Sequence, residues 1–167
     1  LVLAKLNRHP RGIVPVEDTV LTAFSDVQGP ALYWMVCAWN QAFGGDILEY
    51  GTWPDQGLGY FTVREIEKTL EKAYPGGGWE AAFHAGAAAM CRHILGREYV
   101  RDNGTVARVE QMLMDANWGD STPSVYSFCR RSEFASILLP SHGRGFRAGE
   151  RGMAEWKKNP GDRIGTG

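Results

Sequence analysis

Apolar residues occur in short dense runs along the first third of the chain, and turn residues separate these runs. The run "VLTAFSDV" is rich in Val, Leu, Thr and Phe, a composition typical of buried strands. Two similar runs follow it, with the turn "QAFGG" between them. Short turns of this kind join antiparallel neighbours. The pattern therefore predicts a meander of three strands over residues 20–27, 31–40 and 46–53.

The hydrophobic period changes after residue 61. Thr62 and Glu65 have the spacing of a helix capping box, and apolar residues recur behind them at helical intervals. A second helical run, "WEAAFHAGAAAMCRHILG", is rich in Ala and ends at Gly96, a residue that suits a helix C-terminus. We therefore expect helices over residues 62–74 and 79–96.

The last third of the chain alternates between the two patterns. It predicts a strand over residues 109–115, a helix over 121–132 with Pro123 in its first turn, and a strand over 134–141. A meander followed by strands reached through helices indicates an α/β fold with a mixed sheet and helices packed on it. Ribonuclease-H-like nucleases use this order, although several other α/β folds also begin with a meander.

Length and composition narrow the organisation of the chain. Its 167 residues suit one domain. Because Pro10, Gly12 and Pro15 lie among charged residues, we assign residues 1–18 to a linker and 19–167 to the domain. The net charge of −1 gives no global signal for nucleic acid or membrane, so any basic surface must be local. Three widely separated cysteines indicate reduced thiols and an intracellular protein.

Two of the predicted strands end on an aspartate. "LTAFSDVQG" ends in this way at Asp26 and "VEQMLMDANWG" at Asp115, and a glycine follows each aspartate by three or four positions. If the two strands are neighbours, both carboxylates project into one crevice and repel each other unless a cation lies between them. Oxygen ligands suit Mg²⁺ or Mn²⁺, and a pair of such ions supports phosphodiester hydrolysis. The alternative is that each aspartate only forms a turn.

Other side chains are candidates for the same surface. Glu49, on the third strand, either lends an outer carboxylate to the crevice as a further metal ligand or faces the sheet edge. A Gly-rich segment after the last strand is a candidate for contacts with DNA phosphates, and its alternative is a solvated loop. The candidate DNA-binding residues of this segment are His142, Arg144, Arg147 and Arg151.

Seven short stretches occur in an order that resembles one known family. The stretches are "LTAFSDVQG", "YGTWP", "GREYVRDNG", "MLMDANWGDST", "FCRRS", "LPSHGRG" and "NPGDRIG". Together they resemble the nuclease domain of the large terminase subunit of tailed phages, in the GpA-like class, from about residue 12 to 165. The resemblance implies a ribonuclease-H-like endonuclease that cuts concatemeric double-stranded viral DNA during packaging, with two Mg²⁺ or Mn²⁺ ions as cofactors.

The resemblance also assigns roles and partners. Asp26 matches the family's first-strand acid, and Asp115 matches the acid at the end of the later strand. The family's third acid lies in a helix beyond "NPGDRIG", which this chain does not reach, and Asp162 does not match it. An ATPase motor precedes the domain in the family, and no GxxxxGK[ST] motif occurs here. The implied partners are DNA, other terminase subunits and the portal, in the host cytoplasm and transiently at the procapsid.

Two other functions fit the residues. One is a non-catalytic packaging module that binds DNA or the portal, and the other is a different ribonuclease-H-like nuclease such as a resolvase or transposase.

Overall fold

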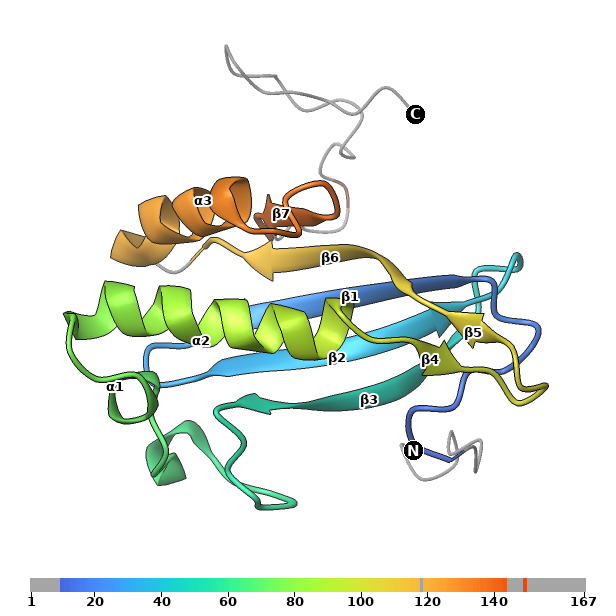
Figure 1. Cartoon of the computed structure of the whole chain (residues 1–167), viewed down its shortest axis with the longest axis horizontal. Coiled ribbons are helices and arrows are strands. Elements are labelled where there is room, and N and C mark those ends of the chain that lie inside the picture. The colour runs from blue at the N-terminus through green and yellow to red at the C-terminus, as the bar shows by residue number, and fades with distance from the viewer. Residues whose placement is uncertain (1–9, 118, 144–148, 150–167) are drawn as a thin grey trace, which may run out of the picture.

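A five-stranded mixed sheet forms the centre of the chain (Figure 1). The computed structural model describes residues 10–117, 119–143 and 149. The strand order is β3-β2-β1-β6-β7, with β1–β3 antiparallel and β1, β6 and β7 parallel to one another. This arrangement confirms the predicted α/β fold. The strands are β1 (Val20–Val27), β2 (Leu32–Trp39), β3 (Gly45–Trp53), β6 (Val109–Asp115) and β7 (Leu138–Ser141).

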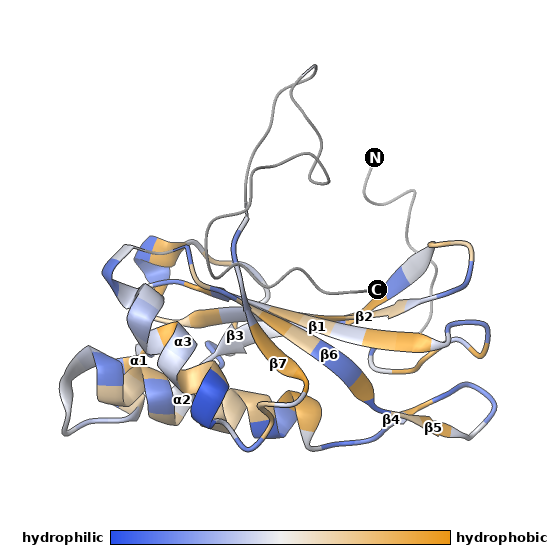
Figure 2. Cartoon of the chain, turned by 90° about the horizontal axis from the view of Figure 1, so that it is seen from above, coloured by the Kyte–Doolittle hydropathy of each residue, from blue (hydrophilic) through white to orange (hydrophobic). Residues whose placement is uncertain are grey.

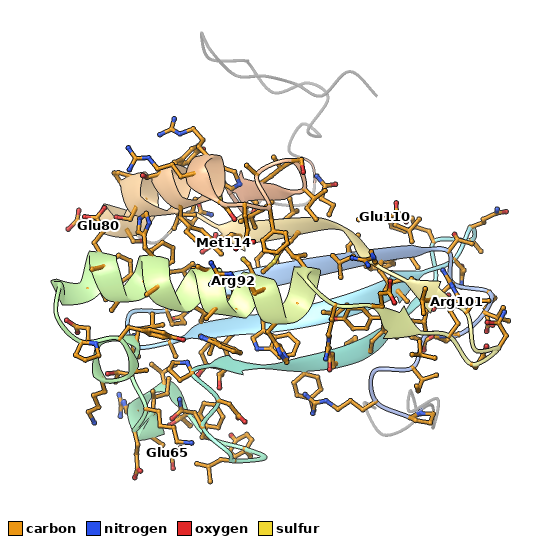
Figure 3. The ribbon with its side chains drawn as sticks, viewed as in Figure 1. Glu65, Glu80, Arg92, Arg101, Glu110 and Met114 are labelled. Carbon is orange, nitrogen blue, oxygen red and sulfur yellow. The ribbon has the colours of Figure 1, made fainter. Side chains whose placement is uncertain are left out.

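Two helices cover one face of this sheet. They are α2 (Gly78–Leu95) and α3 (Thr122–Arg131), and Figure 2 shows both on the same side. Phe83 of α2 and Phe128 of α3 hold the helices together, with ring centroids 5.8 Å apart. Met114 of β6, labelled in Figure 3, is fully buried on this side. The core therefore lies between the helices and one face of the sheet.

The helix predicted over residues 62–74 is two short pieces in the structure. The pieces are the 3-10 turn η2 (Val63–Glu65) and α1 (Leu70–Ala73). The capping box is confirmed, because Glu65 Oε2 accepts from the backbone N–H of Thr62 at 2.7 Å. Between the pieces, the buried amide of Gln56 binds backbone groups of Glu67 and Lys68. These bonds satisfy the backbone in a non-helical conformation, so the helix is interrupted.

A small hairpin and the N-terminal segment lie beyond the edge of the sheet. The hairpin pairs β4 (Tyr99–Val100) with β5 (Val106–Ala107), and the sequence pattern did not indicate it. Arg101, on this hairpin in Figure 3, forms a bridge with Val14, which is fully buried. Residues 10–18, assigned to the linker by composition, thus pack as part of the domain.

None of the described helices is long and apolar enough to cross a membrane. The three cysteines are free thiols, and two of them, Cys91 and Cys129, are buried. Burial raises the pKa of Cys91 to about 12 and that of Cys129 to about 11. Both are therefore protonated at neutral pH and act as small apolar side chains of the core.

Candidate functional site

Asp26 and Asp115 end two neighbouring strands. β1 and β6 run parallel, and their register pairs Ser25 with Met114. Each acid is the next residue on its own strand, so the two carboxylates emerge side by side at one edge of the sheet. Both side chains are partly buried. The structure thus brings together the two acids that the sequence paired.

These acids lie on the face of the sheet away from the helices. The Ser25 hydroxyl is buried and donates to Met90 Sδ of α2 at 3.8 Å, so Ser25 faces the helices. Side chains alternate along a strand, which places Asp26 on the opposite face together with Phe24. Phe24 and Leu113, next to the acids on this face, are each 38% exposed. No helix among the described residues covers this surface.

Neighbouring donors hold one oxygen of each carboxylate. The Gln28 amide donates to Asp26 Oδ2 at 2.7 Å, and the backbone N–H of Asn117 donates to Asp115 Oδ1 at 3.2 Å. Tyr33 pairs with Asp26 across β1 and β2. Burial, and then the negative charge of Asp26, raise the pKa of Tyr33, so its hydroxyl remains protonated at neutral pH. The site therefore sets both carboxylates in fixed orientations.

His142 follows the end of β7. Ser141, the residue before it, pairs with Asp115, whereas the His142 ring contacts Tyr126 of α3 on the helix side of the sheet. His142 Nδ1 donates to the Asn117 amide oxygen, and its Nε2 lies 3.0 Å from the hydroxyl of Tyr126. Asn117 also donates from its amide to the Gly143 carbonyl at 2.7 Å. The sequence analysis missed Asn117 as the residue that joins the Asp115 loop to the segment after β7.

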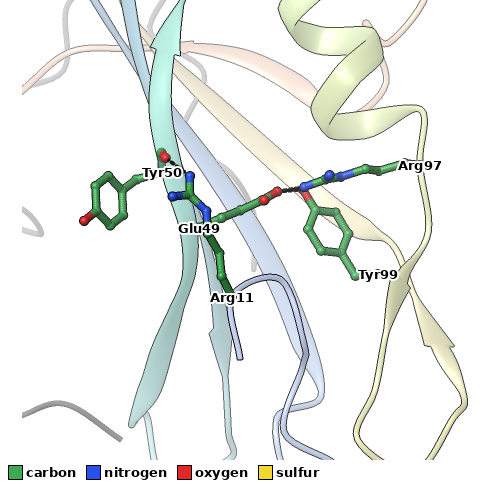
Figure 4. Close-up of polar contacts among 5 residues, drawn as sticks. All are labelled: Arg11, Glu49, Tyr50, Arg97 and Tyr99. Atoms are coloured by element: carbon green, nitrogen blue, oxygen red, sulfur yellow. Dashed lines mark hydrogen bonds and ion pairs between the residues drawn. The ribbon is translucent and has the colours of Figure 1, made fainter. Parts of the chain in front are cut away.

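Glu49 does not share the crevice with Asp26. It pairs with Val36, which faces the helices, and its carboxylate forms an ion pair with Arg97 and accepts from the Tyr99 hydroxyl at 3.1 Å. Figure 4 shows Glu49 and Tyr50 on opposite sides of β3. The prediction of an outer carboxylate was wrong, because strand alternation turns this side chain to the other face.

Two further predictions concern the DNA-binding arginines and the metal ligands. Arg144, Arg147 and Arg151 lie outside the described residues, so their contacts with DNA stay a prediction. Within residues 10–117, 119–143 and 149, no group of three or more His, Cys, Asp or Glu side chains is arranged to hold a metal ion. The pair Asp26 and Asp115 thus has no third side chain of these types placed to share a metal ion with it among the described residues.

The chain is similar to one known family over almost its whole length. A family model described as the endonuclease domain of the terminase large subunit gpA matches residues 1–163. No curated protein matches the chain.

Two solved structures, both of Ppx/GppA proteins from Aquifex aeolicus, are also similar to part of the chain. The first is 8% identical with a TM-score of 0.38, and the match covers 74% of this chain and 36% of the solved chain. The second is 10% identical with a TM-score of 0.33, and the match covers 74% of this chain and 35% of the solved chain. The chain thus spans about a third of the length of these proteins, and so distant a likeness carries no argument about function.

Proposed function

The chain belongs to the family of terminase large subunit gpA endonuclease domains, and from that premise we propose that it is a divalent-metal-dependent endonuclease domain that cuts concatemeric double-stranded DNA during viral genome packaging. The observation that supports this most directly is the adjacency of Asp26 and Asp115 on the uncovered face of the sheet. The proposed partners are DNA, other terminase subunits and the portal. The proposed location is the host cytoplasm, with transient binding to the procapsid.

The residues at these strand ends fit Mg²⁺ or Mn²⁺. Two carboxylates side by side repel each other, and their hard oxygen atoms are the ligands these ions prefer. In our proposal Asp26 and Asp115 hold the metal, and a further carboxylate comes from outside the described residues. When bound, divalent metal would activate water for in-line attack on a phosphodiester and stabilise charge on the leaving oxygen.

The chain's own residues would prepare this chemistry by orientation. Gln28 and the backbone N–H of Asn117 each hold one oxygen of a carboxylate, which reduces the reorganisation needed when substrate binds. Asn117 also forms hydrogen bonds with His142 and Gly143, at the start of the Gly-rich segment after the last strand. We propose that His142, Arg144, Arg147 and Arg151 contact the DNA backbone, an interaction that is independent of sequence and sensitive to salt.

A plasmid-nicking assay in Mn²⁺ tests the function. We expect Asp26→Asn and Asp115→Asn each to lower the rate at least about 100-fold, as expected when a group acts mainly on the transition state. Asp120→Asn is the matched control, because Asp120 is an exposed acid close to the site. Unimpaired cutting by both variants would contradict the proposal. Duplex binding without any cutting by the unmodified chain would favour the non-catalytic packaging module.

A further inference from the structure

A groove of about 810 Å³ lies along the edge strand β3 and the loop that follows it. Aromatic rings dominate its lining. They come from β2, from β3 and from the loop between Trp53 and η2. Trp34 and Trp53 contact His93 of α2 on the helix side of the sheet. The other rings of the lining are those of Tyr33, Tyr50, Tyr60 and Phe61.

One residue of the groove lining, Tyr33, is a cross-strand neighbour of the candidate metal site. Tyr33 lines the groove and is also the cross-strand partner of Asp26, on the same face of the sheet. Phe61, from the loop, stacks on Tyr33 with ring centroids 6.2 Å apart. A strand of DNA whose phosphate lies at Asp26 would therefore reach the groove with its next nucleotides.

Two of the rings are open to solvent. Tyr60 is 87% exposed and Tyr50 is 64% exposed, although large aromatic side chains are usually more buried. The guanidinium carbon of Arg11 lies 5.3 Å from the centre of the Tyr50 ring (Figure 4). Flat aromatic faces with a cation beside them match the two parts of an unpaired nucleotide, its base and its phosphate.

The charges of the lining are compatible with this ligand. Of the two acids, Glu49 is paired with Arg97 on the helix side of the sheet. The carboxylate of Asp55 accepts from the backbone N–H of Gly57 at 2.9 Å. Arg11 is exposed, and no ion pair involves it among the described residues, so its charge is available to a phosphate.

An added protein strand fits the groove less well. A strand that joined β3 would need the outward carbonyl groups of that edge. The carbonyl of Leu48 already accepts from the Gly12 N–H at 3.0 Å, and the Tyr50 carbonyl accepts from the Arg11 side chain. The backbone of the edge is thus partly used, whereas the aromatic faces of Tyr50 and Tyr60 stay open.

We propose that this groove binds unpaired DNA bases next to the cut phosphate by stacking on Tyr50 and Tyr60, with Arg11 on the backbone phosphate. The inference rests on the proposed nuclease function and adds a preference for DNA that is locally single-stranded beside the site. The groove would thus be a second DNA-binding surface of the domain, and its binding of DNA would not require metal.

The test measures binding of a short fluorescein-labelled oligothymidylate to the 167-residue chain by anisotropy, in EDTA. Base stacking contributes enough that Tyr50→Ala and Tyr60→Ala should each weaken binding roughly 5- to 100-fold. Tyr60→Phe keeps the ring and should bind like the unmodified chain. Phe43→Ala is the matched control, because Phe43 is 88% exposed on the distant β2–β3 turn.

Three outcomes would overturn the proposal. The first is equal binding by the Tyr50→Ala, Tyr60→Ala and Phe43→Ala variants. The second is equal affinity for a blunt duplex of the same length, since it offers no unpaired bases. The third is no oligothymidylate binding by the unmodified chain, which would favour a protein ligand. The binding measurement contains EDTA and involves no cutting, so failure of the nuclease proposal and failure of this one are distinguishable.

Discussion

Glu49 and Arg97 form an ion pair between the edge strand β3 and the segment that follows α2. The Glu49 side chain is 10% exposed and that of Arg97 is 36% exposed. The Arg97 guanidinium lies 4.5 Å from the centre of the Tyr99 ring and donates to the Tyr99 hydroxyl at 3.1 Å. A carboxylate that resembled a metal ligand in the sequence thus joins the small hairpin to the sheet.

Removal of the Glu49 charge should lower stability. Glu49→Gln leaves Arg97 partly buried without its partner, so we expect a loss of about 2 kcal/mol in the free energy of unfolding, measured in urea. Glu133→Gln is the control, because its pair with Arg92 is more than half exposed on both sides and should contribute about 0.5 kcal/mol. Equal losses in the two variants would contradict this interpretation.

Asp18 should make stability depend on pH. Its side chain is fully buried, and neither oxygen has a hydrogen-bond partner of good geometry among the described residues. Burial, then the carboxylates of Asp46 and Glu17, raise the pKa of Asp18, while Asn40 opposes the shift. The fold therefore favours the protonated acid, and stability is lost as pH rises through the raised pKa.

Asp18→Asn should accordingly increase the free energy of unfolding at pH 7 by about 1–3 kcal/mol, the usual cost of an unsatisfied buried group. The gain should shrink as pH falls towards the ordinary pKa of an aspartate. Urea titrations at pH 7 and pH 4 measure both values, and the exposed Glu110, which is not among the groups that raise this pKa, gives a control in Glu110→Gln. A gain that is the same at both pH values would rule out the assignment to ionisation of Asp18.

Gly86 should resist replacement although it lies inside a helix. Gly to Ala in a helix interior usually stabilises by about 1 kcal/mol. Here an added Cβ would lie 2.4 Å from Leu70 Cδ2 and 3.2 Å from the Tyr74 ring, and Leu70 is fully buried. We expect Gly86→Ala to destabilise by about 1–3 kcal/mol. Adding Leu70→Val should recover part of this loss, and strictly additive effects would count against the contact.

Divalent metal should reverse the order of the melting temperatures of the unmodified chain and Asp26→Asn. In EDTA, Asp26→Asn should melt above the unmodified chain, because one of two adjacent like charges is removed. In Mn²⁺ the unmodified chain should melt higher, since metal that binds only the folded state stabilises it, by about 2.7 kcal/mol at 100 times the dissociation constant. Differential scanning fluorimetry measures both conditions. The melting temperature of Asp120→Asn should change as that of the unmodified chain does. If Mn²⁺ raised the melting temperature of Asp26→Asn as much as that of the unmodified chain, Asp26 would not be a metal ligand.

Local patterns were sufficient to predict the five strands of the central sheet and the two long helices α2 and α3. β1 and β2 alternate buried with less buried residues over eight positions, and β6 does so from Gln111 to Asp115, so composition and period agree with the sheet. Asp26 and Asp115 were found because each lies at the C-terminal end of such a strand. The prediction of one continuous helix over residues 62–74 was wrong because Gln56, some ten residues away in sequence, binds the backbone at Glu67 and Lys68. Such a contact leaves no periodic signal.

The sequence could not show on which face of the sheet the Glu49 side chain lies. A strand residue changes face when the register moves by one position, and β2 and β3 have a register shift next to Val36, the partner of Glu49. The groove beside Tyr33 has a similar origin. It depends on how the loop with Tyr60 and Phe61 folds against the sheet, and neither residue belongs to a strand or helix.

The one-sided packing of the sheet sets a limit on how far this domain can be stabilised. Phe24 and Leu113 lie exposed on the face that carries the two acids, and no described helix shields them. An engineer who covered or enlarged this apolar surface would gain buried area, and an evolving sequence would gain the same. Either change would close the approach to Asp26 and Asp115. Stability and access to the two acids therefore compete for the same patch of the sheet.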